Sequence, residues 1–189
     1  MKGLVPVLIL VLAAVAGGCR DSASDNAVPR RYAYPRIEVP DTVTAEACLG
    51  DFSLRYNAEA DTAMLRQGWL DIVYPRFGVT VNLSTNDFAD EASLAASIAN
   101  RRQRMSLNFG DAVCENRTFT NKEGIECFIS GSPDAGMAPI YIMAVRRGSH
   151  TAMLSGAAVF DGPTDPADSI MPVYRAIYDD MVNLLNSLR

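Results

Sequence analysis

The sequence predicts an α+β fold: a single antiparallel β-sheet with a long C-terminal helix packed on one face and a second, mid-chain helix. Two observations carry this prediction. Apolar and polar residues alternate in several successive segments, as they do in strands that bury one face. Residues 168–189 instead repeat apolar side chains at intervals of four and three, the period of an amphipathic helix. We therefore expect the sheet and this helix to share one core.

The N-terminus has the features of an export signal. Lys2 is followed by an apolar run from Leu4 to Ala16 and then by Gly17-Gly18-Cys19. A membrane-spanning helix needs about 20 apolar residues, so this shorter run suits a signal peptide instead. Small residues directly before a cysteine are typical of a bacterial lipoprotein, and we predict removal of residues 1–18 and lipid attachment at Cys19. The alternative is an ordinary signal peptide that ends near a cysteine.

The residues that follow predict a tether and then a domain. Residues 19–31 are small, polar and charged without an apolar period, which indicates a flexible linker between a lipid anchor and a single domain at 32–189. The formal net charge is −5, and this acidic balance argues against a nucleic-acid partner. The expected partner at this end of the chain is the membrane, reached through the lipid.

Strand-like alternation begins at Phe52 and recurs toward the C-terminus. Residues 69–74 and 79–83 predict a hairpin around an aromatic turn. Further strands are expected at residues 123–129, 140–145 and 153–160, with residues 146–150 as the turn between the last two. Short connections between consecutive strands favour an antiparallel meander.

Two segments predict helices. Residues 90–107 place Leu94, Ile98 and Met105 on one side, and the arginines at 101, 102 and 104 are expected in the last turns, beside the helix's carbonyl end. In the C-terminal helix we expect Asp168 or Ser169 as the N-cap and Pro172 in the first turn. Its apolar stripe consists of Ile170, Tyr174, Ile177, Met181, Leu184 and Leu188.

Short motifs in a characteristic order extend along the chain. They are Cys19, Tyr34-Pro35-Arg36-Ile37 before Val39-Pro40, Cys48, the segment 69–77 leading into Asn82-Leu83-Ser84, and the C-terminal segments 154–160, 168–173 and 179–185. This order resembles the gliding-motility lipoprotein GldD family of the Bacteroidetes. The resemblance implies a periplasm-facing, lipid-anchored envelope protein that serves gliding motility and the linked type IX secretion system, with proteins of that machinery as partners.

Three cysteines remain beyond Cys19. Cys114 and Cys127 flank the predicted hairpin at residues 117–125, so we expect them to form a disulfide. A loop of roughly fifteen residues would then contribute about 3 kcal/mol of stability in the chain-entropy model. Cys48 is left as a buried thiol or an intermolecular partner, and we expect the buried state.

No pattern in the sequence predicts catalysis, a metal or a cofactor. His150 is the single histidine and lies in a predicted turn, so a Cys-His nucleophilic pair is not expected. Ser155 precedes Gly156 without the motif of a nucleophile elbow. The adjacent carboxylates Asp179 and Asp180 point in different directions on a helix and are expected to be solvated.

The best candidate for an interaction surface is the aromatic hairpin: Trp69, Tyr74, Arg76 and Phe77. Aromatic and arginine side chains are enriched at binding hot spots. The alternative is that alternate members fill the core, because Leu70, Ile72 and Tyr74 share one strand face. We expect a noncatalytic assembly component, with a ligand- or glycan-binding module using this hairpin as the alternative.

Overall fold

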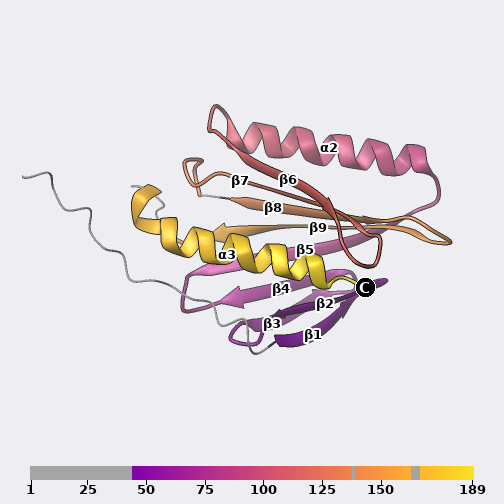
Figure 1. Ribbon diagram of the computed structural model, residues 1–189, viewed down its shortest axis with the longest axis horizontal. Coiled ribbons are helices and arrows are strands. Elements are labelled where there is room, and N and C mark those ends of the chain that lie inside the picture. Colours follow the sequence, from indigo (N-terminus) through magenta and orange to yellow (C-terminus); the bar gives the residue numbers. More distant parts are fainter. Residues whose placement is uncertain (1–43, 138, 163–166) are drawn as a thin grey trace, which may run out of the picture. The chain divides into compact units, whose positions relative to one another are not determined.

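The computed structural model describes residues 44–137, 139–162 and 167–189 (Figure 1). The chain divides into two compact units, residues 1–33 and 34–189, and all described residues belong to the second. The predicted signal, Cys19, the tether and the motifs at 34–40 lie outside the described residues. In the part of the chain that is described, no helix has the length and apolar character needed to cross a membrane.

Seven strands form one antiparallel sheet. Their bounds are β3 (Asp61–Arg66), β4 (Trp69–Tyr74), β5 (Val79–Phe88), β6 (Glu115–Thr120), β7 (Glu126–Gly131), β8 (Ile140–Arg146) and β9 (Thr151–Phe160). Their spatial order is β3-β4-β5-β9-β8-β7-β6. The hairpins β4–β5 and β8–β9 were both predicted, and the antiparallel α+β architecture is confirmed.

The middle of the sheet joins two distant parts of the sequence. β5 and β9 pair along their whole lengths, from Val79 opposite Phe160 to Phe88 opposite Thr151. Helix α2 (Glu91–Phe109) and strands β6 to β8 come between them in the chain. Such a pairing depends on long-range packing, so no local pattern in the sequence predicts it.

A second sheet of two strands was not predicted. β1 (Thr44–Leu49) pairs with β2 (Phe52–Asn57), and β2 is held at the C-terminal end of helix α3 (Ala167–Ser187) (Figure 1). The backbones of Ser53 and Arg189 exchange two hydrogen bonds of 3.0 Å, and the hydroxyl of Ser187 accepts the N–H of Arg55 at 2.8 Å. These bonds satisfy one edge of β2, which explains why it stays outside the main sheet.

Helix α3 covers one face of the main sheet with the predicted apolar stripe. Ile177, Met181 and Leu184 are fully buried in a core shared with β4, β5, β8 and β9. One expectation is wrong in detail. Because α3 begins at Ala167, Asp168 and Ser169 lie within the helix rather than before it, and Pro172 lies beyond the first turn.

Helix α2 packs on the opposite face. The alternation of β8 shows this directly, since Ile142 joins the core beneath α3 whereas Met143 packs with Leu94 of α2. Asp90 is the N-cap of α2, and its carboxylate accepts the N–H of Ser93 at 2.7 Å. The helix extends to Phe109 and its last turn holds no basic residue, so the three arginines lie farther from the carbonyl end than expected.

Candidate functional site

The predicted aromatic surface is divided by the structure. Tyr74 is 2% exposed and belongs to the core, and Phe77 packs against that core with its ring centroid 6.5 Å from that of Tyr74. Arg76 is exposed and lies over the Phe77 ring, 5.5 Å from its centroid. The three residues are therefore neighbours, but Tyr74 contributes packing rather than surface.

Trp69 lies apart from this group. It pairs with Ser84 at one end of the β4–β5 hairpin, whereas Tyr74 pairs with Val79 next to the turn at the other end. Residues 69 and 74 also occupy opposite faces of β4. Trp69 is 39% exposed, so part of its ring lies at the surface, but it does not form one continuous surface with Arg76 and Phe77.

The buried end of β4 is joined to α3 by a polar contact. The Tyr74 hydroxyl donates a hydrogen bond to the Asp180 carboxylate. Burial, followed by the charge of Asp180, raises the pKa of Tyr74 above its usual range, so the phenol stays neutral and remains a donor. Asp180 was expected to be solvated. Helical spacing explains how it differs from the exposed Asp179, because adjacent residues face different directions.

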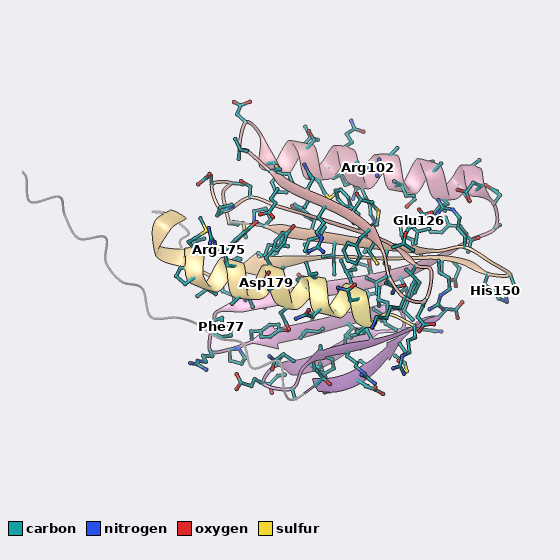
Figure 2. All side chains as sticks on the ribbon, in the orientation of Figure 1. Phe77, Arg102, Glu126, His150, Arg175 and Asp179 are labelled. Atoms are coloured by element: carbon teal, nitrogen blue, oxygen red, sulfur yellow. The ribbon has the colours of Figure 1, made fainter. Side chains whose placement is uncertain are left out.

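A cavity of about 520 Å³ lies beside α3. It is lined by Glu115, Arg117, Pro133, Met171, Tyr174, Arg175, Tyr178 and Asp179. Figure 2 shows Arg175 and Asp179 on α3, one helical turn apart. Its volume falls within the usual range of small-molecule sites, and its lining combines aromatic rings with charges of both signs.

Two tyrosines form the buried wall of this cavity. The rings of Tyr174 and Tyr178 stack at 6.3 Å, and both hydroxyls are buried without a hydrogen-bond partner among the described residues. Desolvation is the main cause that raises the pKa of each phenol, so both are neutral donors. Tyr174 fits here because residue 131 is a glycine: a Cβ there would lie 2.2 Å from the Tyr174 hydroxyl oxygen.

The predicted disulfide between Cys114 and Cys127 is not formed, and both thiols are free. The register of the β6–β7 hairpin explains the error. Cys127 pairs with Phe119, and Cys114 lies five residues before that position. At 3.3 Å per residue the two cysteines are about 16 Å apart along the strands, whereas a disulfide needs Cα atoms within about 7 Å.

The thiols occupy three different environments. Cys127 is buried beneath α3, where desolvation raises its pKa to about 11 and its Sγ lies 3.7 Å from the carbonyl oxygen of Leu185. Cys114 is partly buried, and desolvation also raises its pKa. Cys48 is exposed, contrary to the expectation of a buried thiol.

The structure does not bring together the side chains that nucleophilic catalysis would require. Figure 2 shows His150 at the tip of the β8–β9 hairpin, far from Arg175. Ser155 is buried, and its Oγ lies 3.3 Å from the Oγ of Ser84 rather than beside a base. Among the described residues, no group of three His, Cys, Asp or Glu side chains is placed to hold a metal ion.

The α+β domain of the described residues, together with the predicted export signal, indicates the class of envelope lipoproteins. The chain belongs to the gliding motility lipoprotein GldD family, whose family model matches residues 24–189. A comparison with curated proteins finds no match. Membership of a lipoprotein family places the chain at the cell envelope with a lipid anchor.

Proposed function

We propose that this protein is a noncatalytic component that supports gliding motility, type IX protein secretion, or both, as an assembly or accessory factor. The observation that carries the proposal is the family match over residues 24–189, which includes every described strand and helix. The position of His150 at a hairpin tip, and the contact of buried Ser155 with Ser84 rather than with a base, are consistent with a role in attachment rather than chemistry.

The proposed organisation has three parts: a signal peptide at 1–18, a tether at 19–31 and one domain at 32–189. Lipid on Cys19 would hold the domain at a membrane on its periplasmic side. Several acyl chains give durable anchoring, since each buried CH₂ contributes about 0.8 kcal/mol. The tether would let the domain reach about 20 Å from the membrane as a flexible coil, and up to about 45 Å when extended.

Crosslinking in the intact envelope tests this proposal. A photo-crosslinking residue at Trp69 or Arg76, both exposed, should capture proteins that gliding or type IX secretion requires. The matched control places the photo-crosslinking residue at position 72, where Ile72 is buried, and this variant should capture nothing. Capture of such proteins only by the Ile72 variant, or by none of the three, would contradict a role in that machinery.

The cavity beside α3 favours one second candidate, a ligand- or glycan-binding module. The stacked Tyr174 and Tyr178, with charged groups of both signs around them, resemble the mixed aromatic and polar lining of small-molecule sites. For this alternative we therefore propose the cavity beside α3 as the binding site, instead of the Trp69 hairpin.

Calorimetric titration of the full chain in detergent with neutral and acidic monosaccharides tests this alternative. Saturable binding that Arg175→Ala weakens and Arg76→Ala preserves would support it. Absence of binding across the panel would count against it.

A further inference from the structure

The apolar stripe of α2 is interrupted by a charged residue. Leu94, Ile98 and Met105 face the sheet, and Arg101 occupies the intervening position, three residues after Ile98 and four before Met105. The core beneath α2 is accordingly split into two clusters. One surrounds Leu94, and the other surrounds Met105 and Phe109.

The part of the sheet beneath Arg101 is polar, whereas the parts beneath Leu94 and Met105 are apolar. Ser84 of β5 and Ser155 of β9 are register partners, and both are buried. Their Oγ atoms lie 3.3 Å apart, and Nη2 of Arg101 lies 3.5 Å from the Oγ of Ser84. That distance is at the outer limit of a hydrogen bond, and a guanidinium has five N–H donors. Ser84 therefore satisfies little of the hydrogen-bonding capacity of Arg101.

The positive charge at this position is not neutralised by the described residues. No carboxylate among them lies within 4.0 Å of Arg101, although arginines 55, 76 and 147 all have such partners. The charge that acts on Arg101 is a second cation, Arg104, whose Nε donates to Oδ1 of Asn100 at 3.0 Å. Desolvation and then the charge of Arg104 lower the pKa of Arg101, so burial and a like charge both raise the electrostatic cost of holding the guanidinium here.

A cavity of about 150 Å³ lies between α2 and the sheet, lined by both Arg101 and Arg104 together with Ser155. Asn108 also lines this cavity. It donates a hydrogen bond to the Tyr141 hydroxyl at 2.6 Å, which links α2 to β8. Small-molecule sites usually start at about 300 Å³, so this cavity suits a single charged group rather than a whole ligand.

We propose that this cavity binds a phosphate group, free or as a monoester, between Arg101 and Arg104. A phosphate offers two negative charges and several acceptor oxygens to two guanidinium groups, and Ser155 adds a hydroxyl group to the lining of the same cavity. The competing explanation is that the Arg101 stem only packs under the helix while its head reaches water. The proposal goes beyond the assembly role and does not depend on it.

Calorimetric titration of the full chain in detergent, at constant ionic strength, tests the proposal with three probes: inorganic phosphate, glycerol 3-phosphate and acetate. We expect saturable binding of the phosphates and much weaker binding of acetate, which carries a single charge. A higher affinity for glycerol 3-phosphate would indicate an esterified group, as in a lipid headgroup, and a higher affinity for inorganic phosphate would indicate the free ion.

Three variants separate binding from folding. Arg101→Met continues the apolar stripe and should still fold, with phosphate affinity reduced at least about tenfold, and Arg104→Gln should reduce it several-fold. Arg102→Gln is the matched control, because Arg102 lies over the Phe128 ring at 5.6 Å, and it should leave phosphate affinity unchanged. Absence of phosphate binding, acetate binding of equal strength, or undiminished binding by a folded Arg101→Met variant would each overturn the proposal.

Discussion

At the scale of single residues, polar contacts and close approaches fix how α3 sits on the sheet. The Tyr74 hydroxyl reaches Asp180 across 106 positions of sequence, and Gly131 leaves room for Tyr174. Neither contact follows from a local pattern. Both depend on which residues of α3 and of the sheet come into contact in the folded chain. Each contact can be tested by a substitution that removes or adds a single heavy atom.

Tyr74→Phe removes the donor to Asp180 and leaves the packing of the ring unchanged. Because the partly buried carboxylate then loses a hydrogen bond, we expect the free energy of unfolding to fall by about 1–3 kcal/mol. Urea titration measures this change. In the Asp180→Ala background, which lacks the acceptor, the same substitution should cost clearly less, and equal costs in the two backgrounds would show that the contact contributes nothing.

Gly131→Ala adds a Cβ that would meet the Tyr174 hydroxyl oxygen at 2.2 Å. We expect destabilisation of about 1–3 kcal/mol from the forced displacement. Gly136→Ala is the matched control, since a Cβ there would have no atom within 4 Å. Tyr174→Phe should partly rescue Gly131→Ala by removing the oxygen, and failure of this rescue would place the strain elsewhere.

At the scale of elements, the two helices are attached to the sheet to different degrees. The stripe of α3 is continuous and is buried from Tyr174 to Leu188, whereas the stripe of α2 is broken at Arg101. The continuous stripe was predicted because its period is local. The inward position of Arg101 was not predicted, because an arginine in a helix usually indicates a solvated face. Only the contact with Ser84 beneath it shows that Arg101 faces the sheet.

Leu184→Ala should therefore be costly. Leu184 is 1% exposed beneath α3, and truncation leaves a cavity, so we expect a loss of about 2–5 kcal/mol in the free energy of unfolding. Leu107→Ala in α2 changes the same atoms at a residue that is 74% exposed, and should cost less than about 0.5 kcal/mol. Chemical denaturation measures the free energy of unfolding of both variants. Similar losses would contradict the burial of Leu184 beneath α3.

The start of α2 should depend on pH. Hydrogen bonds from Ser93 lower the pKa of the Asp90 carboxyl, so the capped state binds its proton less readily than the unfolded chain. The stabilisation is present above the unfolded pKa of about 4 and is lost as pH falls through the lower folded value. Asp90→Asn keeps an N-cap acceptor and should show a weaker acid-induced loss of stability below about pH 4. An identical acid profile in both proteins would rule out this contribution.

At the scale of the whole molecule, segments with their own period were predictable and contacts between segments were not. The β4–β5 and β8–β9 hairpins and α3 follow from alternation and spacing within short stretches. The β6–β7 register could not be read in this way, because no local signal fixed which residue opposes Cys127, and the disulfide prediction failed for that reason. The separate β1–β2 sheet likewise depends on Arg189, far along the chain.

The family relation was predictable because it rests on the order of motifs along nearly the whole chain, and the match over residues 24–189 confirms it. The candidate sites were predictable only in part. Trp69 and Arg76 are exposed as an interaction surface requires, but Tyr74 is in the core. The α3 cavity and the Arg101 site are assembled from residues that lie far apart in the sequence.

We propose that this protein serves gliding or type IX secretion as a lipid-anchored, noncatalytic component. The most direct measurement is single-cell gliding and export of type IX cargo in a deletion strain of a gliding host, complemented with variants of the gene. We predict that deletion abolishes at least one of the two activities, that the wild-type gene and His150→Ala restore it, and that Cys19→Ala does not. Normal gliding and normal export in the deletion strain would contradict the claim, and loss of function with His150→Ala would contradict its noncatalytic part.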